Sequence, residues 1–220
     1  LPFILSSVYG TLGATIIGVP IGLLTAVFLS KAAAPKLRTV VVTAIELLSG
    51  IPSVVFGLLG MQVLVPAVAK TFGKASGACL LSAIVVLSIM ILPSIVSVSV
   101  TALNAVPPEY EQGSLALGAT DTETWFKISI PGQPKSGIAA GVVLGIGRAI
   151  GETAVVLYTM GQAINLPISP LDSGRPMTVH LYLLANDGIN MNAAYGTALL
   201  LMAIILAFNL FARYLSRKRR

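Results

Sequence analysis

The chain has 220 residues, of which 55% are hydrophobic and 10% are charged, and it carries a formal net charge of +6. Soluble domains contain about 25% charged residues, so this composition excludes an ordinary soluble protein and indicates an integral membrane protein. The only cysteine is Cys79, which excludes a disulfide framework or a thiolate metal cluster within the chain.

Five apolar stretches reach the length that crosses a hydrocarbon core, about 20 residues, and we expect each to form a transmembrane helix. They cover residues 4–30, 39–69, 76–103, 137–160 and 193–215. They lack the strict alternation of an outer-membrane barrel, so the expected fold is an all-α bundle of five transmembrane helices in a single domain, 1–220. Pro20, Pro52 and Pro93 are candidate kinks. Because the chain begins with Leu1 instead of methionine, we expect a further helix upstream.

Lysine and arginine in the loops predict the orientation, because cytoplasmic loops are enriched in both. One side of the membrane receives Lys31, Lys36, Arg38, Lys127, Lys135, Arg213, Arg217, Lys218, Arg219 and Arg220. The other side receives only Lys70, Lys74 and Arg175. We therefore expect a cytoplasmic C-terminus and an external N-terminus. The positive charge is expected to meet anionic lipid headgroups, with no nucleic-acid partner.

The loop between the third and fourth stretches, residues 106–135, is too long and too patterned for a simple turn. We expect two short helices there, the first beginning at Pro107-Pro108 and the second capped by Thr120 or Asp121, with Gly118 between them. The pattern alone leaves two interpretations open. The loop is either a docking element for another protein or a segment lying in the membrane interface.

Two charges lie inside the fourth apolar stretch. Arg148 and Glu152 are four residues apart, so on one helix they can pair on one face, past the middle of the membrane. They flank a stripe of small residues suited to close helix packing, formed by Gly137, Gly141, Gly145, Ala149 and Thr153. The pair is either a structural ion pair between helices or a charged lining of a solute pathway.

Motifs for nucleotide or metal chemistry are missing from the sequence. There is no GxxxxGK[ST] phosphate loop, and Gly145, Gly147 and Gly151 have the spacing GxGxxxG instead of GxGxxG. His180 is the only histidine, and metal sites need three or four ligands. We expect no catalytic residues, no metal site and no cofactor bound by this chain.

The cytoplasmic loop resembles the coupling loop of ABC importer permeases, which reads EAA, three residues, Gly, nine residues, Ile, one residue, Leu-Pro. Gly118, Ile128 and Pro131 are in register, Ile130 replaces the leucine, and Gln112-Gly113-Ser114 replaces the EAA triplet. The resemblance favours docking over the interface interpretation, and Glu111 is expected to substitute for the missing glutamate. The residues that it implies in coupling to an ATPase are Glu111, Gln112, Gly113, Ser114, Ala116, Gly118, Ala119, Ile128 and Pro131.

Three segments resemble permease subunits of phosphate ABC importers. They read LLSGIPSVVFGLLG, IMILPSIVSVS and SGIAAGVVLGIGRAIGETAVVLYTMG. Related sulfate and molybdate permeases continue with Phe-Gly where this chain has Thr153-Ala154, so phosphate is favoured. The segment ETAVVLYTMG is more similar to the A-type than to the C-type phosphate permease.

This resemblance implies a non-catalytic permease of a bacterial or archaeal cytoplasmic membrane, with Arg148, Glu152 and Thr153 on the substrate pathway. It implies as partners a second homologous permease, two ATPase subunits that use the ATP, and an external phosphate-binding protein. The alternatives are a permease for another oxyanion, sulfate or molybdate, and a secondary transporter or channel in which Arg148 and Glu152 relay ions.

Overall fold

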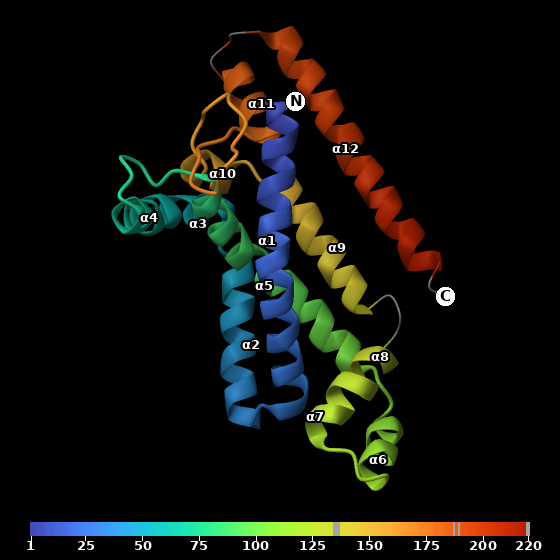
Figure 1. Ribbon diagram of the computed structural model, residues 1–220. Coiled ribbons are helices and arrows are strands. Elements are labelled where there is room, and N and C mark those ends of the chain that lie inside the picture. Colours follow the sequence, from blue (N-terminus) through green and yellow to red (C-terminus); the bar gives the residue numbers. More distant parts are fainter. Residues whose placement is uncertain (134–136, 187, 189, 219–220) are drawn as a thin grey trace.

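The computed structural model describes residues 1–133, 137–186, 188 and 190–218. Within these ranges the regular secondary structure is helical, without a strand, so the predicted all-α class is confirmed (Figure 1). Lys135, Arg219 and Arg220, which contribute to the predicted charge asymmetry, lie outside them, as does the end of the predicted loop 106–135. Among the described residues, four helices are long and apolar enough to cross a membrane: Pro2–Ala32, Ser53–Phe72, Leu80–Asn104 and Met191–Phe211.

The centre of the bundle is the pair formed by α1 (Pro2–Val27, continued by the π-helical turn η1, Phe28–Ala32) and α5 (Leu80–Asn104). Small residues let the two backbones approach closely. A Cβ atom added at Gly18 would lie 2.8 Å from Ile91 Cδ1, and one at Gly22 would lie 2.8 Å from Ile95 Cγ2. The Ser88 hydroxyl also donates across this contact to the Ala14 carbonyl, at 3.3 Å. Pro20 and Pro93 both lie inside these helices, which continue past them.

The second predicted transmembrane helix is wrong as one continuous element. Its residues form α2 (Pro35–Gly50), α3 (Ser53–Leu59), the π-helical turn η2 (Gly60–Leu64) and α4 (Val65–Phe72). The break lies before Pro52, whose ring forces Ile51 out of the helical region, at φ −70° and ψ 127°. In Figure 1, α2 runs beside α1, and α3 with α4 lies across them.

The fourth predicted helix is also wrong as a continuous span. α9 (Gly137–Ile150) ends after 14 residues, and α10 (Ala154–Thr159) begins after a non-helical break at Gly151-Glu152-Thr153. α9 packs against α5 and α1, while α10 packs between α3 and α5. The sequence GRAIGET therefore does not form one helix. It ends one helix and starts another inside the bundle.

The remaining helices complete the two ends of the molecule. α11 (Met177–Asn186) lies at the same end as the N-terminus, and α12 (Met191–Lys218) then runs in the same direction as α1 along α11 and α9 (Figure 1). The opposite end carries α6 (Pro108–Ala116), α7 (Asp121–Thr124), the π-helical turn η3 (Trp125–Ser129) and α8 (Ile130–Gly132).

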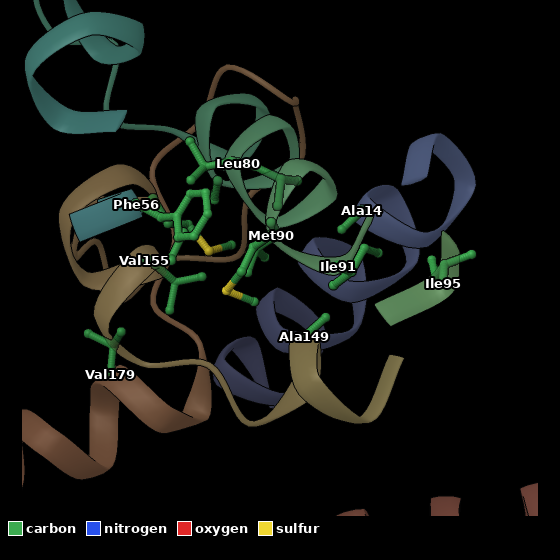
Figure 2. Packing of buried hydrophobic residues seen from close by; sticks show 14 residues of the cluster. Ala14, Phe56, Leu80, Met90, Ile91, Ile95, Ala149, Val155 and Val179 are labelled. Atoms are coloured by element: carbon green, nitrogen blue, oxygen red, sulfur yellow. The ribbon is translucent and has the colours of Figure 1, made fainter. Parts of the chain in front are cut away.

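Among the described residues, two apolar clusters hold these elements together. The larger gathers side chains from α1, α3, α5, α9, α10 and α11, and Figure 2 shows Met90, Phe56 and Val155 side by side within it. The smaller cluster lies at the α6–α8 end of the bundle, where Trp125 and Ile130 pack against a buried group that includes Leu29 and Leu103. Many large apolar side chains outside these clusters are exposed, as expected where lipid is the solvent.

Candidate coupling element and helix break

The loop between α5 and α9 forms two short helical units, as the sequence predicts. α6 is the first unit, and α7, η3 and α8 form the second. We call residues 106–133 the coupling element. Gly118 joins the two units with φ +87°, a left-handed conformation that costs a residue with a Cβ atom about 1–2 kcal/mol. The glycine of the motif is thus required by the turn.

A capping box begins the second unit. The Thr120 hydroxyl accepts a hydrogen bond from the Glu123 backbone N–H, and the Glu123 carboxylate accepts one from the Thr120 backbone N–H at 3.1 Å. The Thr120 backbone N–H is the main cause of a lowered pKa of Glu123, about 2, and the nearby Lys127 lowers it further. Glu123 is therefore ionised at any pH at which the protein is expected to work.

The predicted coupling residues face in two directions. The outward-facing group is exposed and comprises Gln112, Gly113, Ala116, Gly118 and Pro131. Half-buried positions are Ala119, Ile128 and Ser114, whose hydroxyl lies 2.9 Å from the Thr124 hydroxyl. Beside the outward group lie exposed apolar side chains, Tyr110, Leu115, Phe126 and Leu117, the last 91% exposed. The element thus presents an apolar surface away from the bundle, as a docking element requires.

Glu111 lies on the inner side of α6. Its carboxylate forms an ion pair with Lys31 of η1, and the Ser129 hydroxyl of η3 donates to the same carboxylate oxygen at 2.8 Å. The sequence did not predict this contact, which joins residues 80 positions apart. Glu111 is thus bonded within its own chain, and its expected substitution for the glutamate of the EAA triplet stays a prediction.

Arg148 and Glu152 do not form the ion pair that their spacing would allow on one helix, because the helix that would align them ends at Ile150. The ion pairs between described side chains are Lys31–Glu111 and Lys127–Glu123. Arg148 is half-buried in the last turn of α9, and its guanidinium makes no hydrogen bond or ion pair with any residue that the structure describes. Its guanidinium is therefore not neutralised by Glu152.

Glu152 instead stabilises the break. One carboxylate oxygen accepts the backbone N–H groups of Ala154, at 3.0 Å, and Val155, at 3.4 Å, which are the first free donors of α10. The Thr178 hydroxyl of α11 donates to the Glu152 carbonyl at 2.8 Å. These bonds satisfy backbone groups that a break inside the membrane would otherwise leave without partners.

Thr153 faces an open cleft of ≈ 750 Å³ between α3, α10 and α11. The cleft is lined by Thr153, Thr178, Tyr158 and Tyr182 together with Val54, Ala154, Leu157, Leu181, Ala185 and Asn186. Its walls are mainly apolar and carry several hydroxyl groups. On the other side of the break, Glu152 and Thr178 line a cavity of ≈ 10 Å³ with Ser6 and Thr11 of α1. The break thus lies between the cleft and α1.

The predicted stripe of small residues on α9 forms the contact with α5. Gly141, Gly145 and Ala149 are buried, and a Cβ atom added at Gly145 would lie 3.1 Å from Ile95 Cγ1. Thr153 leaves the stripe because it lies in the break. Sequence reasoning missed the equivalent stripe on α1, which the same four-residue spacing of Gly10, Ala14, Gly18, Gly22 and Ala26 could have revealed. No local pattern in the sequence could have predicted that Lys31 binds Glu111 or that Thr178 binds the Glu152 carbonyl, because both contacts join residues far apart in the chain.

Comparisons with known proteins identify the family to which this chain belongs. Residues 18–220 match the family model described as "Binding-protein-dependent transport system inner membrane component". A "Probable ABC transporter permease protein YqgH" of Bacillus subtilis is 37% identical over 100% of this chain and 72% of its own length. The phosphate transport system permease protein PstC of Xylella fastidiosa is 35% identical over 94% of this chain and 70% of its own length. The phosphate transport system permease protein PstA 2 of Mycobacterium bovis is 32% identical over 94% of this chain and 69% of its own length.

Solved structures share the fold. A chain from inward-facing conformations of the MetNI methionine ABC transporter has a TM-score of 0.77 at 19% identity, over 97% of this chain and 92% of that one. A chain of a bacterial alginate importer has a TM-score of 0.74 at 17% identity, over 99% and 78%. The relatives include both phosphate permease types, C-type proteins at 31–35% identity and A-type proteins at 32%, so the preference for the A-type stays a prediction. The chain belongs to the family of binding-protein-dependent transport system inner membrane components, as an ABC importer permease.

Proposed function

We propose that this chain is a transmembrane subunit of an ATP-driven phosphate importer and forms half of its translocation pathway. The observation that carries the proposal is its 31–35% identity to phosphate transport permeases of both types across most of its length. Thr153-Ala154, where sulfate and molybdate permeases are expected to have Phe-Gly, also favours phosphate. The expected partners are a second homologous permease, two cytoplasmic ATPase subunits and an external phosphate-binding protein.

ATP is hydrolysed by the partner ATPase in this proposal, and the permease binds no cofactor. The coupling element docks the ATPase through its exposed residues around Leu117 and Gly118. Two observations support a cytoplasmic location for this end of the molecule. η1 with Lys31 and the start of α2 with Lys36 lie there beside the coupling element, and α12 runs towards this end (Figure 1). The proposal therefore has a cytoplasmic C-terminus.

Phosphate passes the helix break in the proposed mechanism. Arg148 offers a guanidinium whose donors match a phosphate oxyanion, and no described carboxylate competes for it. Thr153 contributes a wall of the cleft. Glu152 fixes the backbone next to Thr153, through its bonds to Ala154 and Val155. A single positive charge without a tight cage is compatible with release, which transport requires.

The test is competition for transport by the natively purified complex in proteoliposomes with ATP inside and binding protein outside. We expect the complex to take up labelled phosphate. A hundred-fold excess of sulfate or molybdate should lower the initial rate of this uptake by no more than about two-fold, since a dedicated site discriminates between ligands by several kcal/mol. Uptake of labelled sulfate or molybdate in preference to phosphate would assign the chain to another oxyanion importer. Purification of the chain without an ATPase would oppose the ABC mechanism itself.

A further inference from the structure

The coupling element is attached to the bundle in two different ways. Its second unit is attached by apolar packing, because Trp125 and Ile130 join the cluster that contains Leu29 and Leu103. Its first unit, α6, has no buried residue, and it packs mainly on η3 and α7. Yet α6 carries the exposed apolar side chains that would meet a partner. A force applied to α6 therefore needs a specific connection to reach the transmembrane helices.

The cluster of Lys31, Glu111 and Ser129, which we call the Glu111 cluster, provides that connection. The Lys31 and Glu111 side chains are only 12% and 23% exposed, and Ser129 is fully buried. The other ion pair among the described side chains, Lys127–Glu123, is 72% and 47% exposed and links neighbouring turns of the same unit. Exposed pairs of that kind contribute little, whereas removing one partner of a shielded pair leaves an unpaired charge.

The connection leads to α1, which spans the whole bundle. Lys31 lies in η1, the continuation of α1, and the neighbouring Ser30 hydroxyl donates to the Asn104 side-chain oxygen at the end of α5, at 2.6 Å. At the far end of α1, the Ser7 hydroxyl accepts the Met177 backbone N–H of α11 at 2.9 Å. Near it, Ser6 and Thr11 share a cavity with Glu152 and Thr178. One helix therefore contacts the coupling element at one end and lines, near its other end, a cavity beside the break on the proposed phosphate path.

We propose that Glu111, held by Lys31 and Ser129, is a positioning residue that transmits movement of α6 to the cytoplasmic end of α1. This inference rests on the proposed function. It assigns Glu111 to a contact within the permease, in place of a contact with the ATPase. The carboxylate forms the joint between α6, η1 and η3, so that the ATPase moves α1 and the coupling element together.

The experiment measures ATP hydrolysed per phosphate transported by the purified complex in proteoliposomes, and the amount of ATPase bound. Glu111→Gln keeps the side-chain shape but removes the charge, and Lys31→Met removes the other partner. Both variants are expected to bind normal amounts of ATPase while the ratio rises at least about five-fold, the lower end of usual coupling free energies. The charge exchange Lys31→Glu with Glu111→Lys should recover the ratio. Glu109→Gln, on the exposed side of α6, is the matched control and should not change it.

Three results would overturn the positioning role. The first is an unchanged ratio of ATP hydrolysed to phosphate transported in either single variant. The second is loss of bound ATPase in Glu111→Gln but not in Lys31→Met, and the third is a charge-exchange variant that assembles but does not recover the ratio. The second result would place Glu111 in the contact with the ATPase. Ser129→Ala removes one hydrogen bond and no charge, so it tests the cluster if a charge variant does not fold. A wild-type complex without ATP-driven phosphate uptake would refute the proposed function itself, which separates the two failures.

Discussion

At the scale of single residues, the structure changes the interpretation of the two intramembrane charges. A four-residue spacing favours pairing only if both residues share a helix, and Glu152 lies beyond the end of α9. Its carboxylate caps α10 instead. The sequence could predict that both residues matter inside the membrane, but not that a helix would end between them. This separation favours Arg148 on the solute path over Arg148 in a structural ion pair.

Replacement of Arg148 by glutamine should therefore impair phosphate transport without preventing assembly of the complex. We expect a loss of phosphate uptake of at least about ten-fold, since a charged hydrogen bond is worth about 1.5–3 kcal/mol, with unchanged co-purification of the partner subunits. Arg148→Lys, which keeps the charge and loses the planar set of donors, should fall between the wild type and Arg148→Gln. A variant that no longer assembles would return Arg148 to a structural role.

Gly118 permits a residue-scale test of the coupling turn. Gly118→Val places a branched side chain at φ +87°, so the turn between α6 and α7 should shift. ATP hydrolysis should then be uncoupled from phosphate transport. Gly73→Val is a matched control, because Gly73 also has positive φ, at +63°, and open space around it, but lies at the end of α4. The measurement is the phosphate uptake supported by a given rate of ATP hydrolysis. Equal coupling in both variants would contradict the role of this turn.

At the scale of elements, the sequence predicted where apolar segments lie and missed where their backbones break. Hydropathy is averaged over a window of residues, so it gives no sign that the helix breaks at Pro52 or at Gly151-Glu152-Thr153. The coupling element was predictable in more detail, because proline at a helix start, a capping box and a turn glycine are local signals. Its attachment to Lys31 was not, since that contact depends on the tertiary fold.

Leu117 is the most exposed apolar side chain of the coupling element, at 91%. If α6 docks into a groove of the ATPase, Leu117→Asp places a charge in that apolar contact and should reduce co-purified ATPase at least about five-fold, since a buried leucine contributes about 1.5–3 kcal/mol. Ile168→Asp is the control, because Ile168 is 90% exposed in the loop between α10 and α11, far from the coupling element. Normal ATPase binding by Leu117→Asp would exclude this surface from the interface.

At the scale of the whole molecule, close contacts along α5 hold the bundle together. Both α1 and α9 present small residues to α5, so that three backbones pack closely where lipid supplies no hydrophobic drive for helix association. The stripe on α9 was predictable from its four-residue spacing. Which helix it contacts was not, because spacing identifies a face and not the neighbour that covers it.

Gly18→Leu tests this packing. The added side chain meets Ile91 and the Ser88 carbonyl at once, so overpacking should destabilise the purified protein by about 1–3 kcal/mol and lower its melting temperature in detergent. Gly196→Leu, in α12, has open space around it and should melt like the wild type. Equal melting temperatures for the two variants would show that the contact between α1 and α5 is looser than the structure indicates.

The measurement that tests the central claim most directly is phosphate uptake into proteoliposomes that contain the natively purified complex, with external binding protein. Uptake with ATP inside is compared with uptake driven only by an imposed ion gradient. The account predicts uptake that requires internal ATP and falls at least about ten-fold in Arg148→Gln. Uptake that follows the gradient and ignores ATP would contradict it, and would make the chain a secondary transporter or channel.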